Sequence, residues 1–264
     1  MKFSCCIEMI YTALPFEERI GKAAQAGFDY FEFWNWNNKD LEGIKKAISK
    51  YNIHPITFQG SLNGVMVDKN DKTIYIEDVK RSLSVARELG AKTVFCMSDI
   101  MQEDRSVKPH PRFISVDEAA QSSIDVLKTL APLAEAAGVT LVCEPLNTLV
   151  DHKGYSLHST AVGVEIVKAV DSPHVKLLYD AYHMQIMEGN IIDTISENVE
   201  YFGHFHIADV PGRHQPGTGE MNYVNIIRAL KKAGYDRAVG FEFAPKDGED
   251  DTIARSILAM LKNA

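Results

Sequence analysis

The sequence predicts an α/β protein, a single (β/α)8 TIM barrel that spans residues 1–264 as one domain. Its 264 residues match the roughly 250 residues that are typical of this barrel. A unit also recurs along the chain, in which a helix ends in Ala-Gly or Leu-Gly and a short β-prone run follows. Eight such runs alternate with helical stretches, and this number favours a closed barrel of parallel strands over an open doubly wound sheet.

The recurring unit predicts where the strands lie. Its clearest copies are AGFDYFEF at 26–33, LGAKTVFC at 89–96, AGVTLVCEP at 137–145 and AGYDRAVGFEF at 233–243. Glycine is favoured just past a helix because it adopts the left-handed cap without a Cβ clash, and the β-branched or aromatic run that follows is typical of a buried strand. In chain order we expect strands at about 3–9, 29–34, 54–59, 92–97, 139–144, 175–180, 203–207 and 238–243.

Helices are expected in every interval between strands, and a last helix is expected at about 251–262. Before the fifth strand, Ser115 and Glu118 have the spacing of a capping box at the start of a helix. Pro132 lies inside that helical pattern. Because proline lacks an N–H group, we expect a kink or an altered turn there.

Composition and charge exclude several kinds of partner. The net charge of −8 argues against nucleic acid, which calls for a basic surface. No signal peptide is recognisable, and no apolar run approaches the roughly 18 residues of a membrane span, so a cytoplasmic protein is expected. Without a CxxC pair, the four cysteines are expected to be buried, reduced thiols; they are Cys5, Cys6, Cys96 and Cys143.

Four neighbouring strands end in polar residues that could bind a metal ion. Strand ends at the C-terminal face carry the chemistry of such barrels, and the residues there are Glu144, Asp180, His206 and Glu242. Three carboxylates that converge in an apolar setting repel one another, and a divalent cation would relieve this repulsion. The oxygen-rich set suits Mn²⁺ or Mg²⁺, with Co²⁺ as a third candidate, and fits a sulfur-rich zinc site poorly.

Each of these residues also has an ordinary structural explanation when it is taken alone. A single strand-end acid is often a helix N-cap or an ion-pair partner, and a lone histidine in a strand is more often a core residue. The coincidence across four strands favours the metal site. His204 lies two residues before His206 on the same strand face, so the pattern alone leaves open which histidine is the ligand.

Several longer stretches resemble the hydroxypyruvate isomerase branch of the xylose-isomerase-like TIM barrels, a framework that also occurs in ketose 3-epimerases. They are EPLN at 144–147, GYSL at 154–157, YDAYHMQIMEGN at 179–190, GHFHIADVPGRHQPGTGEMNY at 203–223 and GFEF at 240–243. The resemblance implies that one divalent metal is bound by Glu144, Asp180, His206 and Glu242, and so selects His206 over His204. It also implies substrate contacts from His183 and Arg213. A glutamate that ketose epimerases carry six residues after the first ligand is replaced here by Val150, with Asp151 beside it.

The resemblance predicts a metal-dependent isomerase that converts hydroxypyruvate to tartronate semialdehyde by enediolate proton transfer, with Glu144 and Glu242 as the catalytic acid–base groups. A ketose 3-epimerase acting on a longer sugar is the alternative. A metal-dependent phosphodiesterase and a non-catalytic sugar-binding protein are less favoured, because the chain is acidic and both glutamates are present. The expected partner is a small sugar or hydroxy-keto acid, and a homo-oligomer is compatible with the sequence, although periodicity reveals no interface.

Other polar or aromatic residues leave two or more interpretations open. Glu32 in the second strand could line the pocket or serve a hydrogen-bonded structural role, and Trp34 and Trp36 could wall the pocket or pack at the rim. PGTGE at 216–220 is expected to be a turn and not a phosphate loop, because no Lys-Ser/Thr follows it. The polar segment 98–113 could be a lid, an oligomer contact or a mobile loop.

Overall fold

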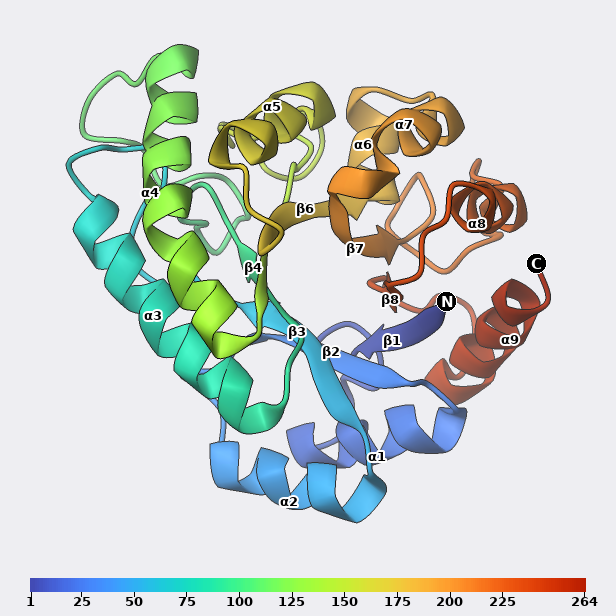
Figure 1. The fold of residues 1–264 in the computed structure, drawn as a ribbon. Coiled ribbons are helices and arrows are strands. Elements are labelled where there is room, and N and C mark those ends of the chain that lie inside the picture. The colour runs from blue at the N-terminus through green and yellow to red at the C-terminus, as the bar shows by residue number, and fades with distance from the viewer.

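The computed structural model describes residues 1–264 and shows a closed barrel of eight parallel strands in chain order (Figure 1). The strands are β1 (Lys2–Cys6), β2 (Tyr30–Asn35), β3 (His54–Gln59), β4 (Thr93–Cys96), β5 (Thr140–Cys143), β6 (Val175–Asp180), β7 (Phe202–Ile207) and β8 (Ala238–Phe241). The barrel closes because β1 pairs with β8 as well as with β2. Each strand overlaps the interval predicted for it, with ends that differ by up to three residues, and the predicted fold class is confirmed.

Helices surround the barrel and fill every interval between strands (Figure 1). They are α1 (Phe16–Ala26), α2 (Leu41–Tyr51), α3 (Lys72–Leu89), α4 (Val116–Ala137), α5 (Thr160–Val170), α6 (Ala181–Met187), α7 (Ile191–Asn198), the 3₁₀ turn η1 (Val199–Tyr201), α8 (Tyr223–Lys232) and α9 (Asp250–Lys262). The interval between β6 and β7 holds two short helices and the 3₁₀ turn. None of the helices combines the length and the apolarity needed to cross a lipid bilayer.

The helix ends follow the local signals only in part. Left-handed glycines close α1, α3 and α4, as the Ala-Gly and Leu-Gly pairs predict. Ser115 caps α4 by accepting a hydrogen bond from the Glu118 N–H at 3.2 Å. The second half of the capping box is absent, because the Glu118 carboxylate accepts from Arg112 instead. Helix α4 also continues through Pro132, so the expected disturbance does not break the helix.

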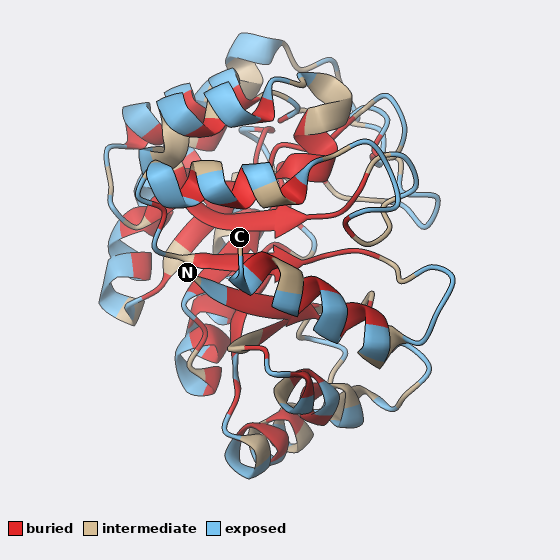
Figure 2. Cartoon of the chain, turned by 90° about the vertical axis from the view of Figure 1, so that its right-hand side faces the viewer, coloured by how far each residue is buried: buried red, intermediate tan, exposed pale blue.

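The core joins the barrel interior to the inner faces of the helices. Buried positions follow the strands and the inward helix faces, and exposed positions lie on the outer helix faces (Figure 2). Seventy-one buried hydrophobic residues form one cluster, and within it Phe33 and Phe58 stack with ring centroids 5.2 Å apart. All four cysteines are buried and unpaired, as the sequence predicted.

Strand register brings the polar strand ends to one level of the barrel. Asp180 at the end of β6 pairs with His206 in β7, and His206 pairs with Gly240 in β8, two residues before Glu242. Because all strands are parallel, their carboxyl ends meet at one rim. The polar groups that follow β5 to β8 therefore converge on a single site.

Candidate metal centre and active site

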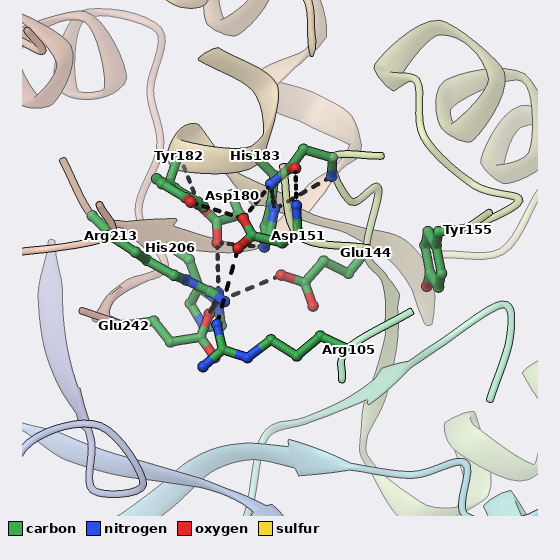
Figure 3. Close-up of polar contacts among 12 residues, drawn as sticks. Arg105, Glu144, Asp151, Tyr155, Asp180, Tyr182, His183, His206, Arg213 and Glu242 are labelled. Atoms are coloured by element: carbon green, nitrogen blue, oxygen red, sulfur yellow. Dashed lines mark hydrogen bonds and ion pairs between the residues drawn. The ribbon is translucent and has the colours of Figure 1, made fainter. Parts of the chain in front are cut away.

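The four side chains predicted as metal ligands meet at the C-terminal rim of the barrel (Figure 3). Glu144 follows β5, Asp180 ends β6, His206 lies in β7 and Glu242 follows β8. One ligand atom from each lies within 4.8 Å of the others, and all four residues are buried. The structure thus gathers the whole predicted set in one place.

Two atoms of this cluster lack a hydrogen-bond partner, and this is the pattern that a cation site requires. The Nδ1 atom of His206 lies 3.0 Å from Glu242 Oε2 and 3.8 Å from Glu144 Oε1. His206 Nδ1 and Glu144 Oε1 are buried without a hydrogen-bond partner, and such atoms are uncommon because they are costly. Three carboxylates and one imidazole form a donor set that fits a divalent cation.

The two glutamates of the cluster have opposite protonation tendencies. Burial raises the pKa of Glu144 to about 7, and the negative charges of Glu242 and Asp180 reinforce the effect. Burial also acts to raise the pKa of Glu242, but the positive charges of Arg213 and His206 outweigh it and bring that pKa to about 2. A pair of carboxyl groups whose pKa values are pushed apart is typical of an acid–base pair.

The imidazole of His206 lies between carboxylates on both sides: Nε2 faces Glu32, and Nδ1 faces Glu242 and Glu144. Burial acts to lower its pKa, but the nearby charges of Glu242 and Glu32 outweigh this and raise the pKa of His206 well above 6.5. The metal-free protein therefore carries an imidazolium at this position. A metal ion bound at Nδ1 has to displace that proton.

Arg213 brings a permanent positive charge against two of the carboxylates. Its Nη2 donates to Glu242 Oε2 at 2.6 Å and lies 3.4 Å from Asp180 Oδ2. The guanidinium carbon lies 5.3 Å from the centre of the Tyr182 ring, in cation–π range. Arg213 therefore lies at the rim, where the sequence places a substrate contact.

His183, in the first turn of α6, is oriented by Asn147. The Asn147 side-chain oxygen accepts from the Asp151 N–H at 2.9 Å, so the amide nitrogen faces His183 and donates to its Nδ1 at 2.7 Å. The His183 proton is thereby placed on Nε2, which lies 3.5 Å from Asp180 Oδ2 and has no hydrogen-bond partner. Burial lowers the pKa of His183 well below 6.5, so a neutral N–H donor faces the site. No role was predicted for Asn147, whose only signal in the sequence is its place in the EPLN stretch after β5.

Glu32 on β2 supports His206 from inside the barrel. Glu32 Oε2 lies 2.7 Å from His206 Nε2, and Oε1 lies 3.0 Å from His204 Nε2 and also accepts from the Ser4 hydroxyl. His204 therefore belongs to the layer below the cluster, and the structural interpretation of Glu32 is the one observed. Gly240 leaves room for this layer, because a Cβ there would collide with Glu32.

Trp34, near the end of β2, and Trp36, directly after β2, have different surroundings. Trp34 donates from Nε1 to Glu242 Oε1 at 3.1 Å, so it forms part of the wall of the site. Trp36 donates to the Ser82 hydroxyl at 2.8 Å and packs against α3. The sequence left both interpretations open for both residues.

The PGTGE stretch is a turn, as predicted. Asp209 accepts from the backbone N–H of Gly217 at 2.7 Å and of Met221 at 3.0 Å. Backbone N–H groups that a phosphate would need are thus already bonded to a carboxylate.

A closed (β/α)8 barrel with one carboxylate–histidine cluster at its C-terminal rim defines the class of enzyme. Residues 20–264 match the sequence profile of the family described as xylose isomerase-like TIM barrel, and the chain belongs to this family. Hydroxypyruvate isomerase of Escherichia coli K12 is 27% identical over 253 residues, which cover 93% of this chain and 94% of that protein. The 2-oxo-tetronate isomerase of Cupriavidus necator is 28% identical over 259 residues, covering 94% of each. The enzyme class is thus that of an isomerase, and the predicted resemblance is confirmed.

Solved structures share the fold over nearly their whole length. A crystal structure described as an AP endonuclease, family 2, from Brucella melitensis superposes with a TM-score of 0.87 at 26% identity, covering 98% of this chain and 99% of that one. D-psicose 3-epimerase, crystallised in the presence of D-fructose, gives a TM-score of 0.83 at 23% identity, covering 100% and 99%. At 23% identity, the similarity to D-psicose 3-epimerase shows a shared fold and nothing about function.

Protonation of Glu144 and His206 makes metal binding dependent on pH. Below pH 7 a metal ion displaces the protons of both residues, whereas above pH 7 Glu144 is already ionised. We expect calorimetry in buffers of different ionisation enthalpy to count about two protons released near pH 6 and about one near pH 8. In Glu144→Gln the additional proton should be missing near pH 6. An equal proton count at both pH values in the wild type would contradict this assignment.

Removing the charge beneath His206 should weaken metal binding without unfolding the protein. Glu32→Gln keeps the side-chain volume but replaces the carboxylate that holds His206 Nε2, and we expect the affinity for Mn²⁺ to fall about 10- to 100-fold. Glu220→Gln is the matched control, because it removes an exposed carboxylate near the same rim. Titration calorimetry measures both variants, and circular dichroism checks that both fold. Equal Mn²⁺ affinity in Glu32→Gln and the wild type would exclude a positioning role for Glu32.

Proposed function

We propose that the protein is a metal-dependent isomerase of small α-hydroxy carbonyl compounds that converts hydroxypyruvate to tartronate semialdehyde. The observation that carries the proposal is the convergence of Glu144, Asp180, His206 and Glu242 in one buried cluster, with one ligand atom of each within 4.8 Å of the others. The hydroxypyruvate and 2-oxo-tetronate isomerases among its relatives support the choice of substrate.

The reaction moves one carbon-bound proton. C3 of hydroxypyruvate loses one proton and C2 gains one. The C3 hydroxyl also loses its proton and becomes a carbonyl, while the C2 carbonyl oxygen gains a proton and becomes a hydroxyl. A divalent cation held by Glu144, Asp180, His206 and Glu242, either Mn²⁺ or Mg²⁺ with Co²⁺ as a third candidate, would supply Lewis-acid stabilisation of the negative charge on the enediolate.

Glu242 and Glu144 divide the proton transfer between them. Glu242 remains ionised and accepts the proton, and its carboxylate is oriented by Trp34 Nε1 at 3.1 Å and Arg213 Nη2 at 2.6 Å. Glu144 is proposed as the group that delivers a proton to the neighbouring carbon, through the carboxylate oxygen that does not hold the metal ion. The two groups follow β5 and β8, so they approach the substrate from different sides.

His183 and Arg213 are proposed to position the substrate. The unpartnered Nε2–H of His183 is a neutral donor for a substrate oxygen. Arg213 is partly buried against Glu242 and Asp180, and its guanidinium offers further donors to an anionic oxygen. Donors fixed in a buried site stabilise developing charge more strongly than donors in water.

A ketose 3-epimerase is the alternative function. The family resemblance favours it at His206, because histidine at this position is expected in ketose epimerases and glutamine in some hydroxypyruvate isomerases. The same glutamates would serve that reaction. An endonuclease activity is less favoured despite the AP endonuclease likeness, because the net charge of −8 opposes binding to a phosphate backbone.

The test of the proposed function is turnover of hydroxypyruvate by metal-stripped protein, with and without Mn²⁺, followed by NMR. We expect tartronate semialdehyde to form only with Mn²⁺. Glu242→Gln should lower kcat by about 100- to 10,000-fold, because it removes the group that accepts the proton, while Mn²⁺ binding is checked separately by electron paramagnetic resonance. Glu220→Gln should behave as the wild type. If Mn²⁺ binds but hydroxypyruvate is not converted, and a ketohexose is, the epimerase alternative holds.

A further inference from the structure

A second guanidinium, that of Arg105, lies at the rim beside the cluster. Arg105 belongs to the segment between β4 and α4, and its side chain extends from that segment toward the carboxylates (Figure 3). Its Nη1 lies 4.0 Å from Asp151 Oδ1, and its side chain is 61% exposed. A cation at the mouth of the site is therefore accessible to an entering ligand.

The backbone holds Arg105 in place. Arg105 adopts a left-handed conformation with φ 67°, which is unfavourable for a residue with a side chain. Its N–H donates to the Gln102 carbonyl at 3.0 Å, its carbonyl lies 3.1 Å from His152 Nδ1, and the nearby Val107 N–H donates to the Lys153 carbonyl at 3.0 Å. The segment 98–113 is thus docked on the residues that follow β5.

Asp151 faces Arg105 with one oxygen only. Its Oδ2 accepts from the Tyr182 hydroxyl at 2.7 Å and from Asn147 Nδ2 at 2.8 Å. The remaining Oδ1 attracts Arg105 across 4.0 Å, which is too long for a hydrogen bond. Asp151 thus steers the guanidinium toward the site and leaves its N–H groups free, whereas Arg213 is already bonded to Glu242.

The free donors at the rim suit a substrate that carries a carboxylate. Arg213 already donates to Glu242, whereas the Arg105 guanidinium donates no hydrogen bond to the protein and lies 4.0 Å from Asp151 Oδ1. The two carboxylate oxygens of an α-keto acid can accept charge-assisted hydrogen bonds from these N–H groups, and the hydroxyl groups of a neutral ketose are weaker acceptors.

We propose that Arg105 is a specificity-determining residue that receives the carboxylate of an α-keto acid substrate, with Asp151 holding the guanidinium at the mouth of the site. A guanidinium fork matches the two oxygens of a carboxylate. This inference rests on the proposed isomerase function and narrows it to hydroxy-keto acids in preference to neutral ketoses.

The test compares two substrates with the same three-carbon skeleton. Hydroxypyruvate carries a carboxylate where dihydroxyacetone carries a hydroxymethyl group. In Arg105→Gln the ratio of kcat/KM for hydroxypyruvate to that for dihydroxyacetone should fall about 10- to 100-fold, because a charge-assisted pair is lost. Arg105→Lys, which keeps the charge but not the fork, should give a smaller fall. Lys108→Gln, which removes a charge from the same segment, should leave the ratio unchanged.

A binding measurement separates this inference from the proposed function. Calorimetry with tartronate, a dicarboxylate that cannot be isomerised, should show a comparable loss of affinity in Mn²⁺-loaded Arg105→Gln, with Mn²⁺ affinity unchanged. A wild-type protein that binds tartronate through Arg105 but does not convert hydroxypyruvate would overturn the proposed function alone. An unchanged substrate ratio together with unchanged tartronate affinity in Arg105→Gln would overturn the role of Arg105 and leave the isomerase standing.

Discussion

The repulsion between three buried carboxylates at one barrel rim is the constraint on which the rest of the site depends. Parallel strands bring Glu144, Asp180 and Glu242 together, and burial prevents water from screening their charges. In the metal-free site His206 and Arg213 supply compensating positive charge, and we propose that a divalent cation replaces the His206 proton when it binds. The raised pKa of Glu144 reflects its burial first and the negative charges of Glu242 and Asp180 second.

The two halves of the barrel contribute different kinds of side chain to the site. The second half, from β5 to β8, supplies the four groups of the cluster, whereas the first half supplies side chains that hold or surround them. Glu32 on β2 fixes His206 from below, Trp34 orients Glu242, and Arg105 after β4 reaches the mouth of the site. Barrel closure makes these contacts between segments far apart in the sequence.

The features that the sequence predicted are those encoded locally. Strand intervals follow from a glycine cap and a β-prone run within about ten residues, and each candidate ligand was visible because it ends a strand. The contacts of Asn147, Glu32 and Trp34 were not predictable, because they depend on which strands meet across the closed barrel. Strand alternation alone did not separate His204 from His206, whereas the family resemblance selected His206. The structure gives the physical reason, because Nδ1 of His206 lies 3.0 Å from Glu242 Oε2 and 3.8 Å from Glu144 Oε1, and His204 contacts Glu32 in the layer below.

The central claim, one divalent cation held by the four strand-end residues, is tested most directly by anomalous diffraction at the manganese absorption edge from crystals grown with Mn²⁺. A single anomalous peak is expected between His206 Nδ1 and oxygens of Glu144, Asp180 and Glu242, with Arg213 displaced from Asp180. A peak elsewhere on the protein, or none while Arg213 keeps its contacts with both carboxylates, would contradict the claim.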